Sequence, residues 1–485
     1  MTTSTTPPAI PPAIPPAIPP AAPPAAIASA ISSTRPGGPS RSRRGLALAL
    51  LVSAQFVVML DTSIVNVALP SIQASLSLSG SSVSWVVNAY VLTFGGLLLL
   101  CGRVADQVGR RRMFTIGSVL FTVGTLAAAT AAGEWMLIAG RIVQGAGAAC
   151  LSPASMALLL VTFPGEHRAR AMGLWGAASA LGGATGVAAG GLLAGTFGWP
   201  SVFLVTVPVS LLAVVVAGRV LDDSKPRARH HFDLRGAVSI TAAVVALVDG
   251  ALSLASGNWT DFVIVGVLVP VALAAVFIHA ERRAPEPLVP LDLFSSPMLR
   301  IGVALAVLGG AARASTFVLV ALYLQQALAM SPEAGGLAMV PTSLTGFVVS
   351  LVLLPRVLRR FGARRSLVSG LLVLAGGHLW LACAPVGDGY LVGVLPGLLL
   401  VATGVALSFT PTTMVIASAV PDTHAGLASG LASSATQVGA ALGTAAFTAI
   451  ALRDSGSGFP TAFVAAATVA LFTALLGRIA GRSRH

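Results

Sequence analysis

The sequence has 485 residues, of which 55% are hydrophobic and only 9% charged, and its mean hydropathy is +0.88. A soluble protein carries roughly 25% charged residues, so this composition excludes a soluble globular chain and indicates a polytopic membrane protein. The net charge of +13 does not indicate a nucleic-acid partner, because 26 of the 29 Lys and Arg lie in alternate loops or at the termini of the spans predicted below, as the positive-inside rule requires.

The chain begins with a proline-rich segment. Residues 1–44 hold twelve of the 31 prolines, and PPAI occurs three times in residues 7–18. Tandem prolines favour extended polyproline II and form no packed core, so this segment is predicted to be a disordered cytoplasmic tail. It lacks the charged start and apolar region of a signal peptide. Binding of a proline-recognition partner is the alternative to a bland tail.

Fourteen apolar runs follow, each close to the ~20 residues that a membrane-spanning helix needs. An even number of spans, with basic segments at both ends, places both termini in the cytoplasm. The predicted spans are 45–67, 83–101, 113–132, 135–161, 171–195, 200–220, 236–255, 261–280, 301–324, 334–354, 366–384, 390–415, 427–450 and 460–479.

Two segments of the chain recur at nearly one offset. PGEHRARAMG at 164–173 matches PDTHAGLASG at 421–430, and GRVADQVGRRR at 102–112 resembles PRVLRRFGARR at 355–365. The repeat predicts an all-α membrane protein with two similar six-helix bundles and two extra helices between them. The predicted domains are a tail (1–44), an N-terminal bundle (45–221), two extra spans with their loops (222–299), a C-terminal bundle (300–480) and a basic tail (481–485).

Asp61 lies inside the first span, within the stretch LDTSIVNVALP at 60–70. It is about sixteen residues into the span, or ~24 Å at helical rise, where an isolated carboxylate costs roughly 3 kcal/mol. Desolvation favours the neutral carboxyl group, whereas a nearby cation favours the ionised one. A carboxylate exposed alternately to the two sides of a membrane can therefore load and release a proton, and Asp61 is the predicted coupling site.

Arg141 is a second charge within a span. It lies about six residues into the fourth span, close to Gln144, Gly145 and Gly147. A guanidinium is always charged and needs carboxylate or carbonyl partners at this depth, so Arg141 is predicted to adjust the charge of Asp61. The alternative is that Arg141 extends toward the outer interface, which its depth of ~9 Å allows.

The loop GRVADQVGRRR is the most specific signal in the chain. Its glycines allow a tight turn and close approach of helices, and its single acid can bridge basic groups or face a helix N-terminus in one conformation. A merely solvated basic loop would explain the arginines but neither the glycine spacing nor the acid. The residues predicted to form a conformational switch are Gly102, Arg103, Asp106, Gly109, Arg110 and Arg112.

This loop resembles the cytoplasmic signature of the major facilitator superfamily. LDTSIVNVALP and RIVQGAGAA (141–149) resemble the first-span and fourth-span motifs of the drug:proton antiporters, and GGATGVAAGG (182–191) resembles their fifth-span motif. Fourteen spans resemble the branch with two extra central helices. The family motif usually has a proline where this chain has Val187, so a local kink is in doubt, but close helix packing is retained. The packing glycines are Gly182, Gly186, Gly190 and Gly191.

Other polar groups in the spans have no motif to support them. Cavity-lining residues are predicted at Asn88, Gln144, Asp249 and Arg313. For Asp249 and Arg313 the alternatives are a seam between helices and a position near the external surface. The three cysteines read as small core residues, with no disulfide framework. No catalytic residues, metal-ligand cluster or phosphate-binding loop is found, so neither a metal nor a cofactor is expected.

The resemblance implies a proton-driven antiporter that exports small-molecule drugs or antibiotics across the cytoplasmic membrane. Its expected partners are a small-molecule substrate, protons and the lipid bilayer, with a monomeric chain powered by the proton gradient. Two alternatives remain at this stage. One is a proton-coupled importer, or an exporter of an ordinary metabolite, with the same fold, and the other is a polytopic membrane enzyme. A channel is weaker, because the repeat and the loop motif predict alternating gates.

Overall fold

A computed structural model describes residues 41–222, 234–255, 258–284, 287, 289–330, 332–384, 389–421, 424–452 and 458–479. The chain divides into two compact units, residues 1–44 and 45–485, and the account below concerns the second unit. The predicted proline-rich tail falls almost wholly outside the described residues, and the basic C-terminal tail does so entirely. Every regular element in the described ranges is helical.

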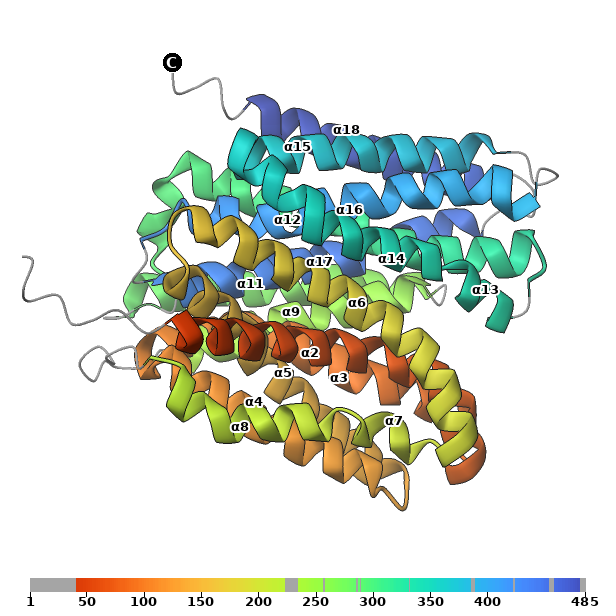
Figure 1. The fold of residues 1–485 in the computed structure, drawn as a ribbon, viewed down its shortest axis with the longest axis horizontal. Coiled ribbons are helices and arrows are strands. Elements are labelled where there is room, and N and C mark those ends of the chain that lie inside the picture. The colour runs from red at the N-terminus through yellow and green to blue at the C-terminus, as the bar shows by residue number, and fades with distance from the viewer. Residues whose placement is uncertain are drawn as a thin grey trace, which may run out of the picture. The chain divides into compact units, whose positions relative to one another are not determined.

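The first part of the chain forms long helices that lie side by side (Figure 1). They follow the apolar runs of the sequence, and each ends at a polar or glycine-containing turn. These elements are α2 (Arg41–Leu76), α3 (Gly80–Val108), α4 (Arg110–Ala129), α5 (Glu134–Thr162), α6 (Glu166–Phe197), α7 (Pro200–Leu204) and α8 (Val207–Val220).

The middle part contributes two further helical runs. α9 packs against both α3 and α17, and α11 packs against α9. Close contact between Gly250 of α9 and Gly266 of η1 brings the two runs together. The elements are α9 (Leu234–Ala255), α10 (Trp259–Asp261), η1 (Phe262–Leu268), α11 (Val269–Arg283) and the short 3-10 turn η2 (Leu291–Ser295).

The last part of the chain is also built from helices. Its elements are α12 (Pro297–Leu322), η3 (Tyr323–Ala327), α13 (Pro332–Ala338), α14 (Val340–Val348), η4 (Val349–Leu353), α15 (Leu354–Cys383), η6 (Gly389–Val394), α16 (Leu395–Ala417), α17 (Ala425–Ala451) and α18 (Gly458–Ile479). Gly362 breaks α15 with a φ of 78°, in the left-handed region that favours glycine.

The structure carries the internal repeat in two ways. Gly109 and Gly362 occupy the same position of the recurring loop motif, and both have positive φ, 111° and 78°. Gly186 contacts the backbone of α2 at Leu60, and Gly443 contacts the backbone of α12 at Ala311. The second copy of the motif lacks the acid, because Arg359 stands where the first has Asp106.

Ten helical runs in the described ranges are long and apolar enough to cross a membrane, judged by length and composition. They include nine runs that match predicted spans, and one run of 50 residues, Ala334–Cys383, that covers two predicted spans on either side of Gly362. α6, α9 and α17 are not among the ten, although they have 32, 22 and 27 residues. The prediction of an all-helical membrane protein is confirmed, whereas the number of fourteen spans stays a prediction.

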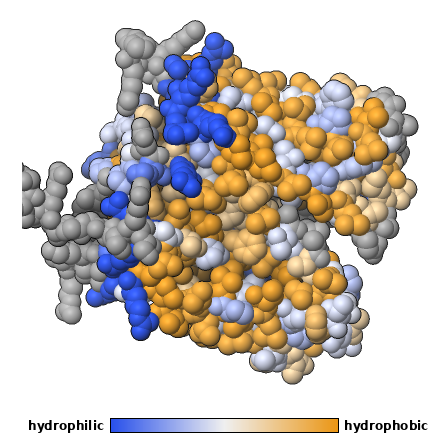
Figure 2. Space-filling view, in the orientation of Figure 1, coloured by the Kyte–Doolittle hydropathy of each residue, from blue (hydrophilic) through white to orange (hydrophobic). Residues whose placement is uncertain are grey.

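Apolar side chains cover most of the face shown in Figure 2, whereas hydrophilic side chains gather near the end at which α2 begins. Such an apolar belt is what a lipid-facing surface requires. Two cysteines are buried as predicted, Cys101 and Cys150, with their sulfur atoms 3.4 Å apart. The prediction for Cys383 is wrong, because it is exposed at the C-terminal end of α15, beyond the tightly packed helix centre.

Candidate functional site

Asp61 lies on α2 with none of its surface exposed. Each carboxylate oxygen accepts one hydrogen bond: Arg141 Nη1 donates to Oδ2 at 2.8 Å, and Gln144 Nε2 donates to Oδ1 at 2.8 Å. Both donors lie on α5, so these bonds join α2 to α5. Arg141 lies 80 residues after Asp61 in the sequence. Charge-assisted bonds of this length are strong, so they offset part of the hydration that the buried carboxylate has lost.

Arg141 is also fully enclosed, with 1% of its surface exposed. Nη1 also donates to Gln144 Oε1 at 2.6 Å, Nε donates to the Val86 carbonyl at 3.0 Å, and the guanidinium lies 4.3 Å from the centre of the Tyr90 ring. Carboxylate, amide, carbonyl and aromatic partners together compensate for the loss of hydration. Arg141 therefore points into the bundle, and does not extend toward an interface.

Gln144 ties this ion pair to a fourth helix. Its Nε2 donates to Thr125 Oγ1 of α4 at 2.9 Å as well as to Asp61. Thr125 and Gln144 are both fully buried. The network thus draws side chains from α2, α4 and α5 and a backbone carbonyl from α3 into one hydrogen-bonded set, here called the Asp61 network: Asp61, Arg141, Gln144, Thr125 and the Val86 carbonyl.

Glycines in the fourth-span motif explain how these helices approach so closely. A Cβ added at Gly145 would lie 2.8 Å from the Tyr90 carbonyl oxygen of α3, and one at Gly147 would overlap the Phe121 amide nitrogen of α4. Both positions therefore require the smallest residue. The spacing RIVQGAG places the charge, the amide and the two contact points on one helix.

The glycine ladder of α6 packs on the turns of α2 that flank Asp61. Added Cβ atoms at Gly182, Gly186 and Gly190 would lie 2.5, 2.8 and 2.9 Å from the carbonyl oxygens of Phe56, Leu60 and Ile64, respectively. Gly191, the fourth predicted packing glycine, is looser, because its nearest neighbour is a Val67 methyl group at 3.8 Å. α6 continues as one helix through position 187, where the family motif has proline.

The loop motif holds the ends of α3 and α17 together. Asp106 Oδ1 accepts from the Gly426 amide at 2.9 Å, and Oδ2 accepts from the Leu427 amide at 2.8 Å. Arg110 donates to the same Oδ1 from Nη2 at 3.0 Å and from Nε at 3.1 Å. Asp106 thus bridges a basic residue and caps a helix N-terminus, where the helix dipole favours a negative charge.

Gly102 makes this capping contact possible. An added Cβ at Gly102 would overlap the Gly426 carbonyl oxygen and lie 2.9 Å from the Gly430 α-carbon. Other motif residues reach different partners: Arg103 donates to the Pro287 carbonyl at 3.1 Å, Gly109 turns the chain with positive φ, and Arg112 is exposed. The six motif residues therefore do not share one set of contacts.

The remaining predicted residues are placed apart from the Asp61 network. Asn88 is half-buried on α3, and Asp249 is half-buried on α9. Arg313 is buried on α12 with 3% of its surface exposed, and its Nη1 lies 3.4 Å from Thr412 Oγ1 of α16. Among the described residues, no group of three or more His, Cys, Asp or Glu converges to hold a metal ion.

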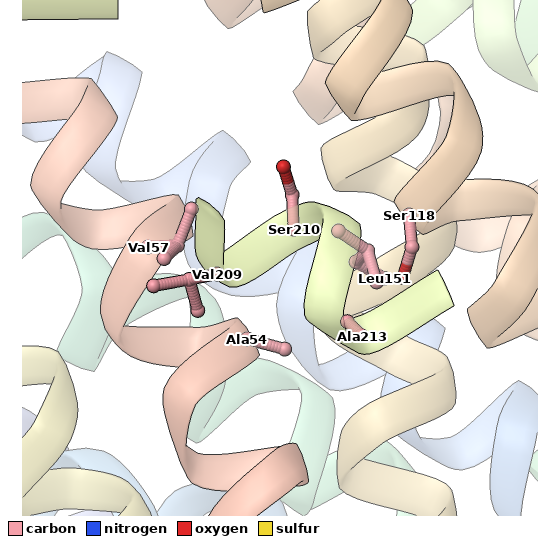
Figure 3. Close-up of a pocket in the computed structure, with 7 residues that line it drawn as sticks. All are labelled: Ala54, Val57, Ser118, Leu151, Val209, Ser210 and Ala213. Carbon is pink, nitrogen blue, oxygen red and sulfur yellow. The ribbon is translucent and has the colours of Figure 1, made fainter. Parts of the chain in front are cut away.

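One small pocket is lined by no residue of the Asp61 network (Figure 3). Its lining is mainly small and apolar, with two hydroxyl groups and no titratable side chain, so it lacks the groups that proton coupling requires. The lining residues come from α2, α4, α5 and α8: Ala54, Val57, Ser118, Leu151, Val209, Ser210 and Ala213.

Sequence reasoning did not identify three contributors to the Asp61 network and its surroundings. Thr125 carried no motif, and Tyr90, which is buried against Arg141, was not among the predicted cavity-lining residues. Phe203 is a second aromatic neighbour, with its ring centre 5.9 Å from the guanidinium carbon of Arg141. The role of Tyr90 depends on its contact with Arg141, which forms only when α3 packs against α5, so no local sequence signal marks it.

Comparison with known proteins agrees with this geometry. The family model described as Major Facilitator Superfamily matches residues 51–444, with a second match at 303–484. The chain belongs to the Major Facilitator Superfamily. It is 36% identical over 420 residues to a cephamycin export protein of Amycolatopsis lactamdurans, and the match covers 85% of each chain. It is 35% identical over 470 residues to a puromycin resistance protein of Streptomyces alboniger, covering 91% of this chain and 92% of the relative.

Solved structures share the fold of this major facilitator protein. The human organic anion transporter MFSD10 superposes with a TM-score of 0.69 over 90% of this chain and 100% of that chain, at 16% identity. Membership of the superfamily makes the protein a transporter, and the membrane-enzyme alternative is excluded on that ground. The predicted family resemblance is confirmed, and with it the multi-pass location in a membrane.

Proposed function

We propose that this protein exports small-molecule drugs or antibiotics across the cytoplasmic membrane in exchange for protons. Its similarity to proteins that are named for antibiotic export and resistance supports the direction of transport and the substrate class. The observation that carries the coupling is the Asp61 network, in which a fully buried carboxylate is bound to a single arginine.

Proton binding conflicts with this network for a geometric reason. Oδ2 of Asp61 accepts from Arg141, and Oδ1 accepts from Gln144. A protonated carboxyl group carries its own hydrogen on one of these oxygens, which then meets a donor that already points at it. Protonation therefore weakens the Asp61–Arg141 pair and loosens α2 from α5, whereas deprotonation restores it. Protonation and helix packing are coupled in this way.

The same logic connects the Asp61 network to alternation of the two bundles. α3 contributes the Val86 carbonyl to the network at one point of its length and carries Asp106 at its C-terminal end. Opening the bundle at that end must break the two hydrogen bonds from Gly426 and Leu427. Release of Asp61 from Arg141 frees α2 and α3 to move against α5, and we propose that this movement strains the Asp106 cap.

The finer topology belongs to the same proposal. Fourteen spans, with both termini in the cytoplasm, agree with the alternation of basic loops and with helical runs at each predicted span. The proposed domains are the N-terminal bundle at 45–221, the two extra helices within 222–299 and the C-terminal bundle at 300–480. The protein is proposed to act as a monomer, without a cofactor, and to draw energy from the proton gradient alone.

Transport into inside-out proteoliposomes tests this proposal. Full-length protein is reconstituted with an imposed inside-acid gradient, and uptake of puromycin is followed together with proton release from an internal pH dye. We expect gradient-dependent uptake in the wild type, its loss in Asp61→Asn, and its retention in Asp292→Asn, which alters an exposed carboxylate. Uptake driven only by the opposite gradient would identify an importer, and full coupled uptake in Asp61→Asn would remove the coupling role.

A further inference from the structure

Arg313 and Arg141 are the two buried arginines that lie inside predicted spans, and their environments differ. Arg313 lies on α12 with 3% of its surface exposed. Nη1 lies 3.4 Å from Thr412 Oγ1, a long contact, and the guanidinium carbon lies 5.9 Å from the centre of the Phe409 ring. A buried guanidinium with one weak neutral partner remains poorly compensated, because a buried charge needs an opposite charge or several strong acceptors.

The unsatisfied donors of Arg313 form one edge of the guanidinium. Nε and Nη2 have no hydrogen-bond partner among the described residues. These two nitrogens carry the parallel N–H bonds that bind both oxygens of a carboxylate side-on, the preferred geometry of arginine with that group. Arg141, by contrast, uses its donors on Asp61, Gln144 and the Val86 carbonyl.

Within the described ranges, no carboxylate of the chain meets this edge. From residue 297 to the C-terminus the sequence has only four acids, Glu333, Asp388, Asp422 and Asp454, and each lies outside the spans predicted from the sequence. No carboxylate in the described ranges lies within 4.0 Å of Arg313, whereas Asp61 and Asp106 are paired with Arg141 and Arg110. Among the described residues nothing neutralises Arg313, so a bound anion is the counter-ion to which this edge is suited.

The surroundings of Arg313 join both bundles. Phe409 of α16 stacks on Trp175 of α6, with ring centres 5.9 Å apart and an angle of 9° between the planes. Trp175 Nε1 and Thr410 Oγ1 are further buried polar atoms without a partner in the described part of the chain. A Cβ added at Gly176 of α6 would lie 2.8 Å from Thr410 Oγ1, so this hydroxyl group lies where α16 contacts α6.

We propose that Arg313 binds the carboxylate group of a small organic anion whose ring-bearing apolar body packs near Phe409 and Trp175. This inference rests on the proposed export function, because it names the chemical class of the substrate. Nε and Nη2 donate to the two carboxylate oxygens, and Thr412 holds the other side of the guanidinium. The position between α6, α12 and α16 allows the bound anion to contact both bundles at once.

Binding to purified full-length protein tests this site without any gradient. The probes are 2-naphthoate and 2-naphthamide, which share a ring system and differ in the carboxylate. We expect the wild type to bind the acid about 10- to 100-fold more tightly than the amide, the range that two charge-assisted bonds support. The preference should fall to near unity in Arg313→Met and to an intermediate value in Arg313→Lys, whose ammonium cannot form two parallel bonds.

Arg300→Met is the matched control, because Arg300 lies on the same helix and is exposed. It should keep the preference of the wild type for the acid. Thermal denaturation without ligand supplies a second readout: Arg313→Met should denature at the same or a higher temperature than the wild type, since an uncompensated charge is removed. A purely structural arginine would instead give a lower temperature.

Three results would overturn the inference: no preference for the acid in the wild type, the same preference in Arg313→Met, or destabilisation of ligand-free Arg313→Met together with an unchanged preference. If Arg313→Met does not accumulate, Arg313→Lys decides the outcome alone. The proposed export function fails separately, through absence of gradient-driven uptake of both puromycin, which has no carboxylate, and a cephamycin, which has one. A protein that transports puromycin but does not prefer the acid refutes only the anion site.

Discussion

Asp61 and Arg313 occupy nearly equivalent positions in the two proposed bundles. Gly186 packs on Leu60 and its repeat partner Gly443 packs on Ala311, so Asp61 corresponds to the residue after Ala311, and Arg313 lies one position further along α12. The two bundles therefore bury charges of opposite sign at the same level. The first bundle neutralises its charge with Arg141, whereas the described residues of the second offer Arg313 a threonine and an aromatic ring.

This difference suggests that the two proposed bundles bind different ions. The carboxylate of the first bundle is matched internally, so the partner that can change its state is a proton. The guanidinium of the second bundle cannot lose its proton and lacks an internal acid in the described ranges, so the partner that can satisfy it is an anion. Proton coupling and anion recognition would then sit in separate halves, linked through the α6 contact with α16.

Removing either member of the Asp61–Arg141 pair should destabilise the protein. Arg141→Met leaves a fully buried carboxylate without its cation, so we expect a loss of about 3–5 kcal/mol in the free energy of unfolding. Titration with a denaturing detergent, followed by circular dichroism, measures this loss. The double variant Asp61→Asn with Arg141→Met should be more stable than Arg141→Met alone, and strict additivity of the two changes would contradict the pairing.

The α6 helix should tolerate a methyl group at Gly191 but not at Gly186. In Gly186→Ala, the new Cβ would lie 2.8 Å from the Leu60 carbonyl oxygen and must push α6 away from α2, at a cost of about 1–3 kcal/mol. Gly191→Ala is the matched control, since its nearest neighbour would be 3.8 Å away. Thermal denaturation of the two purified variants checks this difference, and equal melting temperatures would show that the ladder does not set helix separation.

The cap between Asp106 and α17 should control exchange of two backbone amides. Asp106→Asn removes the charge that accepts from Gly426, Leu427 and Arg110, and an N-terminal cap contributes about 1 kcal/mol. We therefore expect roughly 5-fold faster hydrogen exchange at the start of α17, measured by mass spectrometry. Arg112→Gln, at an exposed position of the same motif, should leave the exchange rate unchanged. Equal rates in wild type and Asp106→Asn would rule out the cap.

Much of the architecture could be predicted from hydrophobic runs and motifs. Apolar runs of ~20 residues located helical elements along the whole chain, because a lipid environment forces backbone groups to bond within a helix. The recurring loop motif anticipated Gly109 and Gly362, whose positive φ only glycine adopts readily. Boundaries were less exact, since α2 and α3 extend several residues beyond the predicted spans. The number of spans stays a prediction.

The site was predictable only in part. Asp61 and Arg141 stand out because isolated charges within apolar runs need partners, and the structure brings them together. Thr125 and Tyr90 are ordinary residues in an apolar helix, and nothing local marks them until α3, α4 and α5 pack around the guanidinium. The unsatisfied edge of Arg313 was equally hidden, because the sequence gives its charge but not the acceptors around it.

The ring of Tyr90 should matter for the Asp61 network more than its hydroxyl group does. The Arg141 guanidinium lies 4.3 Å from the centre of this ring, within the distance at which a cation is attracted to an aromatic face, and both residues are buried. Tyr90→Phe keeps the ring and should retain both stability and coupled transport. Tyr90→Leu removes the ring beside a desolvated cation and should lower the free energy of unfolding by about 2 kcal/mol. Denaturation of both variants distinguishes them. A loss in Tyr90→Phe as large as that in Tyr90→Leu would mean that the hydroxyl group carries the interaction.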